Sequence, residues 1–195
     1  MADCYIVRRG GIGGGEEKAL ITDGLEFALT TTFSDFSNVQ TFGKPSTYGI
    51  TTGIAPRTVE IVNTCGTADN FIISYGNAVR EGRICSLTQT EFVGFYNGMG
   101  YGTLAQSIGK TRHICCVSHG KSMKIYVNGI KKADGILPYD VDPTDELFSL
   151  NSWKGNSPIS SDGTITHEVR IYNKMLTEEE IINNFNFYSE LYALS

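Results

Sequence analysis

One stretch of the sequence decides the fold class: Met123-Lys124-Ile125-Tyr126-Val127-Asn128-Gly129-Ile130-Lys131-Lys132-Ala133. Its first half alternates apolar and polar residues, as a half-buried antiparallel strand does. Asn128-Gly129 then supplies two residues that tolerate the positive φ angles of a type I′ turn, and the second half resumes an extended pattern. The stretch therefore predicts a tight β-hairpin.

Short segments of the same kind follow one another along the chain, separated by Gly, Asn, Asp and Ser. No long segment with a helical period of 3.6 residues interrupts them before the C-terminal region, and this pattern favours an all-β sandwich or barrel. We expect strands at residues 25–32, 58–64, 71–75, 83–87, 91–96, 112–118, 123–127, 130–133, 147–150 and 164–172.

A single amphipathic helix is expected near the C-terminus. Thr177 precedes Glu180 by three residues, which is the spacing of a capping box, and Leu176 is placed to pack against Ile181. One apolar stripe follows at helical spacing: Ile181, Phe185, Tyr188 and Tyr192. The sequence therefore predicts a short helix that packs on the sandwich.

Composition limits the class of protein. The chain has 195 residues, a formal net charge of −5 and 41% hydrophobic residues, which suits one domain with its own core. The acidic balance argues against a nucleic-acid partner, and no apolar run is long enough for a membrane span. Residues 1–24, with the glycine-rich segment 10–15, are expected to form a mobile arm, and residues 25–195 the domain. The first residues lack the apolar segment of a signal peptide, so the localisation stays open.

The cysteines and histidines show no spacing typical of a metal or catalytic cluster. Five cysteines without a Cys-x-x-Cys motif favour buried thiols over zinc ligands or disulfides. Cys115 and Cys116 are adjacent, so in a strand they must point to opposite faces. For His113, His119 and His167 we expect ordinary surface positions at strand edges or turns.

Two motifs resemble a known family. Residues 112–120 followed by Met123–Gly129 are similar to a strand, turn and "VNG" hairpin of laminin-G-like domains in the concanavalin A-like lectin/glucanase superfamily. Residues 165–181 resemble the closing strand of that family, which runs through a "VRIYN" sequence into "LTxEE" and a short helix. The resemblance covers roughly residues 112–190 well and residues 25–111 loosely.

The resemblance implies a jelly-roll sandwich of two antiparallel sheets with a short C-terminal helix. It also implies a concave face or rim loops that bind glycans, in some members together with a calcium ion. Some branches of the superfamily are glycoside hydrolases, while many members are non-catalytic modules or parts of phage and cell-surface structures.

The residues needed for sugar hydrolysis do not stand together in the sequence. A glycosidase requires two carboxyl groups that flank one bond, and alternate positions of one strand are the simplest way to place them. Glu60 and Glu168 instead stand alone on their expected strands. The sequence therefore favours a protein that is not an enzyme.

One acidic loop could bind a cation. Asp140, Asp142 and Asp145 alternate loosely between two prolines, and carboxylate oxygens are the ligands that Ca²⁺ prefers. The alternative is a solvated turn whose aspartates bond their own backbone. No other cofactor is indicated.

Two loops have the composition of a sugar site, which combines aromatic faces with amides. The candidate ligand-binding residues are Tyr96, Asn97 and Tyr101 in the first loop, and Asn151, Trp153 and Asn156 in the second. The alternative for each loop is a core or hairpin aromatic beside ordinary turn residues.

The leading functional prediction is a non-catalytic, lectin-like module whose partner is a glycan or glycoprotein surface. The alternative is a structural or attachment subunit of a phage virion or tail, or of a cell-surface assembly, which the glycine-rich arm would suit. A homo-oligomer is compatible with both predictions, and a glycoside hydrolase is less favoured.

Overall fold

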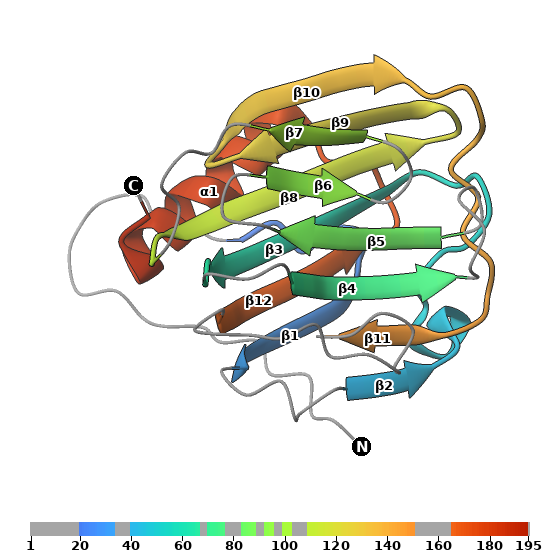
Figure 1. Cartoon of the computed structure of the whole chain (residues 1–195), viewed down its shortest axis with the longest axis horizontal. Coiled ribbons are helices and arrows are strands. Elements are labelled where there is room, and N and C mark those ends of the chain that lie inside the picture. The colour runs from blue at the N-terminus through green and yellow to red at the C-terminus, as the bar shows by residue number, and fades with distance from the viewer. Residues whose placement is uncertain are drawn as a thin grey trace.

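The computed structural model describes residues 20–33, 40–66, 70–76, 83–88, 92–95, 99–102, 109–150 and 165–194. Within these residues, two six-stranded antiparallel sheets lie face to face as a jelly-roll sandwich (Figure 1). Sheet A has the order β1 (Leu25–Phe33), β12 (Ile165–Tyr172), β3 (Arg57–Thr64), β8 (Thr111–His119), β9 (Ser122–Val127) and β10 (Ile130–Ile136). Sheet B has the order β2 (Gln40–Gly43), β11 (Phe148–Leu150), β4 (Asn70–Gly76), β5 (Arg83–Thr88), β6 (Phe92–Phe95) and β7 (Met99–Gly102). The all-β prediction is confirmed.

The core lies between the two sheets. Its sheet A side consists of every second residue of the central strands, such as Ile61 on β3 and Ile114 on β8, which are fully buried. At the β1 edge, the Phe148 ring of sheet B contacts Phe27 edge-on at 5.0 Å between ring centroids and stacks on Phe42 at 4.9 Å. These aromatic contacts join the two sheets where the short strands β2 and β11 offer few other side chains.

The hairpin that decides the fold class forms as expected. Strands β9 and β10 pair antiparallel, and the two turn residues both adopt positive φ, 50° at Asn128 and 71° at Gly129. The Asn128 side chain also accepts a hydrogen bond from the His113 N–H at 2.9 Å, which ties the turn to the neighbouring strand β8. The type I′ turn is therefore both a local sequence preference and a fixed point of sheet A.

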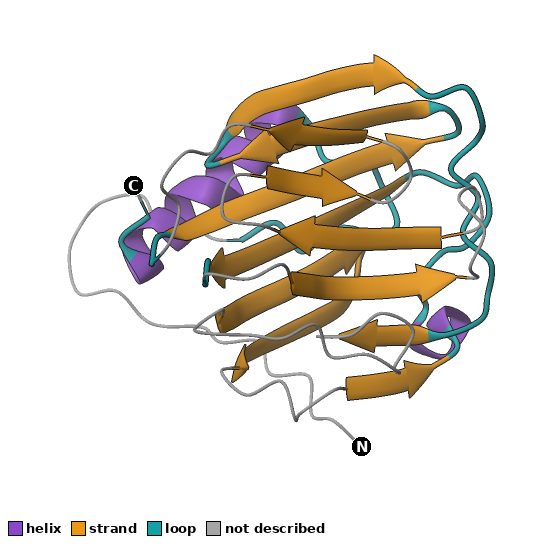
Figure 2. Ribbon diagram, in the orientation of Figure 1, coloured by secondary structure: helices purple, strands orange, loops and turns teal. Residues whose placement is uncertain are grey.

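Helix α1 (Glu178–Tyr192) lies against the outer face of sheet A (Figure 2). Both bonds of the capping box are present, because Glu180 N–H donates to the Thr177 hydroxyl at 3.2 Å and Thr177 N–H donates to the Glu180 carboxylate at 2.8 Å. Leu176 and Ile181 are buried in the same apolar cluster, and Tyr188 of the expected stripe is fully buried. Among the described helices, none is long and apolar enough to cross a membrane.

The structure differs from the sequence-based expectation in three places. Strand β2, the 3₁₀ helix at Pro45–Tyr48 and strand β7 have no counterpart in the expected elements, and β7 includes Tyr101, which the sequence places in a loop. All three elements are four residues long, too short for a periodic pattern to reveal. The outward residues of β12 are also not open to water as in a half-buried strand, because helix α1 covers them: Tyr172 is fully buried.

Residues 20–24, the last part of the expected arm, pack on the domain. Ile21 N–H donates a 2.9 Å hydrogen bond to the Asn184 side chain on helix α1. Asp23 pairs with Lys174 at 2.7 Å. The remainder of the expected arm, residues 1–19, lies outside the described residues.

Candidate functional site

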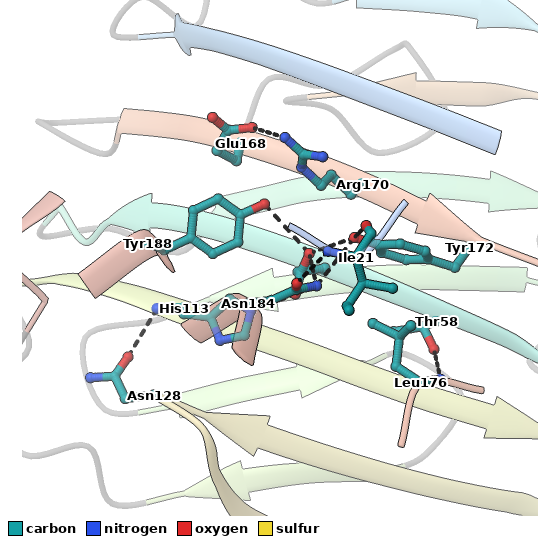
Figure 3. A network of polar contacts seen from close by, with 11 residues as sticks. Ile21, Thr58, His113, Asn128, Glu168, Arg170, Tyr172, Leu176, Asn184 and Tyr188 are labelled. Atoms are coloured by element: carbon teal, nitrogen blue, oxygen red, sulfur yellow. Dashed lines mark hydrogen bonds and ion pairs between the residues drawn. The ribbon is translucent and has the colours of Figure 1, made fainter. Parts of the chain in front are cut away.

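A buried carboxylate forms the centre of the largest described polar network (Figure 3). Glu60 projects from the outer face of β3 into the layer between sheet A and helix α1, where its side chain is 1% exposed. His113 Nε2 on β8 lies 2.8 Å from Glu60 Oε1. The Asn184 amide of the helix donates to both carboxylate oxygens, at 3.1 and 3.3 Å.

Two tyrosine hydroxyls complete this network. Tyr172 on β12 donates to Glu60 Oε2 at 3.1 Å, and Tyr188 on the helix approaches the same oxygen at 3.5 Å. We call these five residues the Glu60 network: Glu60, His113, Tyr172, Asn184 and Tyr188. Three strands and the helix therefore converge on one carboxylate.

The electrostatics of the network favour the ionised carboxylate. Burial by itself raises the pKa of Glu60, but the hydrogen bond and charge of His113, the Asn184 amide and the charge of Arg170 outweigh burial and hold that pKa below its usual value. Burial also raises the pKa values of Tyr172 and Tyr188, and the Glu60 charge adds to this effect. Both phenols therefore stay protonated and serve as hydrogen-bond donors.

A second group of polar residues extends the same layer along β12. Arg170 lies 3.6 Å from Glu168 and places its guanidinium 5.9 Å from the centre of the Tyr188 ring. Glu168 in turn accepts a 3.0 Å hydrogen bond from the Tyr192 hydroxyl. Glu168 is 3% exposed, so this group is closed off beneath the helix in the same way as Glu60.

The geometry makes the Glu60 network a helix anchor and not a catalytic site. A catalytic acid or base must reach a substrate atom, whereas Glu60, His113 and Asn184 are each no more than 1% exposed. The network instead satisfies polar groups that strands and helix bury together. It also fixes the position of helix α1 on the outer face of sheet A.

Our prediction of surface positions for the histidines is wrong for His113. Its side chain is fully buried against Glu60, and its ring lies near the rings of Phe185 and Tyr188. The sequence separates Glu60 from His113 by 53 positions, so this pairing depends on the register of β3 and β8. Outward positions on two strands beneath an amphipathic helix are the one signal available, and without the sheet order that signal does not identify the pair.

The candidate sugar-binding residues lie mostly outside the described part of the chain. This holds for Tyr96, Asn97, Asn151, Trp153 and Asn156, while Tyr101 is described as a backbone position of β7, opposite Val93 of β6. The six residues therefore stay a prediction.

The strand order nevertheless fixes where the two candidate loops begin. Strand β11, which leads into Asn151, is antiparallel to β4, whereas β6, which leads into Tyr96, has the direction of β4 because both pair antiparallel with β5. The arrows of β11 and β6 accordingly point to opposite ends of sheet B (Figure 1). The two loops thus start from opposite ends of the sandwich, and each is a separate candidate site.

The three aspartates of the candidate calcium site have different surroundings. Asp145 accepts bonds from the backbone N–H and hydroxyl of Ser46, at 2.8 and 2.6 Å, and these bonds hold its pKa below the usual value. Among the residues that the structure describes, no three His, Cys, Asp or Glu side chains gather as metal ligands. Calcium at Asp140, Asp142 and Asp145 stays a prediction, and Asp145 has a structural role at the 3₁₀ helix.

The buried thiols agree with the sequence analysis where the structure describes them. Cys65, Cys115 and Cys116 are buried, and the adjacent pair points to opposite faces of β8: Cys116 to the core and Cys115 to the layer under the helix. Burial raises the pKa of the Cys115 thiol, and the Glu60 charge adds to the effect. These cysteines therefore act as small apolar side chains.

Comparison with protein families gives a match to the laminin-G-like model described as the concanavalin A-like lectin/glucanases superfamily, over residues 30–182. The chain belongs to this superfamily. The match covers β1 to the first turns of α1, so it includes both sheets and the start of the anchored helix. Comparison with curated proteins gives no match.

Solved structures share the fold at low sequence identity. The chain is similar to the receptor-binding domain of a botulinum neurotoxin C/D mosaic serotype, with a TM-score of 0.52, 14% identity, and coverage of 69% of this chain and 36% of that one. A leech intramolecular trans-sialidase in complex with 2,7-anhydro-Neu5Ac has a TM-score of 0.63 and 15% identity, over 85% of this chain and 28% of that one.

A third similar structure has nearly the same extent as this chain. It is the CBM40 of the Ruminococcus gnavus IT-sialidase bound to α2,3-sialyllactose, with a TM-score of 0.60 and 15% identity. The match covers 82% of this chain and 98% of that module. By contrast, the chain spans about a third of the botulinum domain.

Proposed function

We propose that this protein is a non-catalytic carbohydrate-binding module. The observation that carries the proposal is that the chain matches 98% of a module whose structure was determined with a bound sialylated sugar. The similarity thus extends over a complete binding unit of the same superfamily. A module of this kind needs a face or rim that is open to a glycan, with aromatic and amide groups on it.

The fold restricts where the glycan can bind. Helix α1 covers the outer face of sheet A above β3, β8 and β12, and its anchor is sealed from water. This leaves the outer face of sheet B and the ends of the sandwich as the surfaces for a ligand. The loops after β6 and β11 both begin at sheet B, as the candidate residues of the sugar site require.

The described carboxylates support a binding function without catalysis. The strand-borne glutamates of sheet A, Glu60 and Glu168, are engaged beneath helix α1, where no glycosidic bond can reach them. Glycoside hydrolysis requires two carboxyl groups that flank the sugar bond. An attachment subunit of a virion, the alternative from the sequence, has no support in the comparisons.

A glycan array probed with the purified protein, with and without EDTA, tests the proposal. We expect retention of a defined set of glycans, and a loss of signal in EDTA would place a cation in the site. Absence of all array signal, or release of reducing sugar from polysaccharides, would refute a non-catalytic binding module.

Single substitutions then test which loop binds the sugar. We expect Trp153→Ala to abolish retention with an unchanged circular dichroism spectrum, because the ring face that stacks on sugar C–H groups is lost. The matched variant Trp153→Phe keeps an aromatic face and should retain part of the binding. Unchanged binding by Trp153→Ala would exclude that loop and move the test to Tyr101→Ala.

A further inference from the structure

Two polar side chains on the inner face of sheet A have no hydrogen-bond partner within the described structure. They are Asn63 near the end of β3 and Arg112 near the start of β8, which lie directly opposite each other in the β3–β8 pairing. Both belong to the inner face because the neighbouring alternate residues, Ile61 and Ile114, are in the core. Arg112 is 3% exposed and Asn63 is fully buried.

The lack of partners is complete for both side chains. All three guanidinium nitrogens of Arg112 and both amide atoms of Asn63 are buried without a hydrogen bond in this part of the chain. Burial of an unpaired charge is costly, so native proteins satisfy such groups. Burial accordingly lowers the pKa of Arg112, and the nearby Cys65 opposes this in part.

Another buried arginine on the same face shows how such a group is satisfied within the chain. Arg57, at the other end of β3, is 1% exposed, and its guanidinium donates to the backbone carbonyls of Gly53 and Ala55. Arg112 has no comparable set of acceptors in the described residues. The two arginines therefore have different roles: Arg57 fixes a loop, and Arg112 has its donors available.

A carboxylate matches this pair of side chains. A guanidinium presents a planar pair of N–H donors that fits the two oxygens of a carboxylate, and its charge compensates that of the anion. The adjacent Asn63 amide adds a further donor. We propose that Arg112 and Asn63 form an anion site inside the sandwich, at the end where β3 terminates and β8 begins, and that this site takes a carboxylate.

The carboxylate has two conceivable sources, an acidic sugar of a bound glycan or a free small acid. The site lies at the end of the sandwich from which β11 leads toward Asn151, because β8 starts and β3 ends at that side (Figure 1). If the source is an acidic sugar, the inference rests on the proposed function and makes acidic glycans its ligand class. If the source is a free acid, the site is independent of glycan binding.

Isothermal titration in a low-salt zwitterionic buffer tests the inference. Sodium acetate represents the free acid, and 3′-sialyllactose represents the acidic glycan, with lactose as its neutral counterpart. We expect at least one of the two carboxylates to bind the wild type and lactose to bind more weakly than 3′-sialyllactose if the glycan is the source. Arg112→Gln should weaken the carboxylate at least tenfold, and Arg112→Lys should weaken it by less because the charge remains.

Stability measurements separate a ligand site from a structural arginine. Without added carboxylate, Arg112→Gln should unfold at the same or a higher urea concentration than the wild type, because an uncompensated buried charge is removed. The matched control Lys121→Gln removes an exposed charge at the other end of β8 and should leave carboxylate binding unchanged.

The outcomes distinguish this inference from the proposed function. Binding of acetate without any array signal would support the anion site and refute the glycan-binding module. Array binding of neutral glycans alone, with no heat from either carboxylate, would support the module and refute the anion site. Equal carboxylate binding by the wild type and Arg112→Gln would also refute the anion site.

Discussion

Replacing Asn184 by alanine tests whether the Glu60 network anchors helix α1. The substitution removes two donors to the Glu60 carboxylate, at 3.1 and 3.3 Å, and the acceptor of the Ile21 N–H at 2.9 Å. A hydrogen bond to a buried charged group contributes about 1.5–3 kcal/mol, and an ordinary one about 1 kcal/mol. The expected loss in the free energy of unfolding is therefore about 2–4 kcal/mol.

Urea unfolding followed by circular dichroism measures this loss. Asn186→Ala is the matched control, since it makes the same exchange on the same helix and gains the same helix propensity at a half-buried position outside the network. Surface exchanges of this kind usually change stability by less than about 0.5 kcal/mol. If Asn184→Ala and Asn186→Ala differ by less than that amount, the network does not anchor the helix.

Two further predictions concern the same layer. The pKa of Glu60 is lowered in the folded protein, so its ionised form contributes stability that is present above the usual value of 4.5 and lost as the pH falls through the folded value; urea midpoints from pH 7 to pH 3 should therefore fall more steeply for the wild type than for Glu60→Gln, and parallel curves would contradict the assignment. Gly129→Ala should destabilise the protein by about 1–3 kcal/mol, because φ is +71° there and the new Cβ would lie 3.0 Å from the Phe185 ring; an unchanged thermal midpoint would show that the hairpin can shift away from the helix.

The sequence predicts those parts of the fold that local chemistry determines. Asn128-Gly129 specifies its turn through two positive φ angles, and Thr177 with Glu180 specifies the start of the helix, so a few adjacent residues are enough to locate both. Strands β2 and β7 are missed because four residues give too few alternations to recognise. Local patterns therefore identify most elements but not their complete number.

The polar sites depend on sheet order, which no local pattern contains. Glu60 meets His113 and Asn184 only because β3 lies beside β8 and α1 crosses both. Asn63 and Arg112 likewise face each other through the β3–β8 register. In the sequence these residues are isolated polar positions in apolar strands, and their partners lie on segments far along the chain.

The position of β12 in the middle of sheet A has a consequence for how the protein is made. Strand β12 pairs with β1 on one side and β3 on the other, so Leu25 pairs with Tyr172, a residue near the end of the chain. During synthesis, β1 and β3 each present an unpaired edge until this late strand emerges from the ribosome, and contacts between distant segments form slowly. Nascent chains truncated before residue 165 should therefore be recognised by chaperones and proteases as incomplete, whereas addition of β12 and α1 closes both edges in a single step.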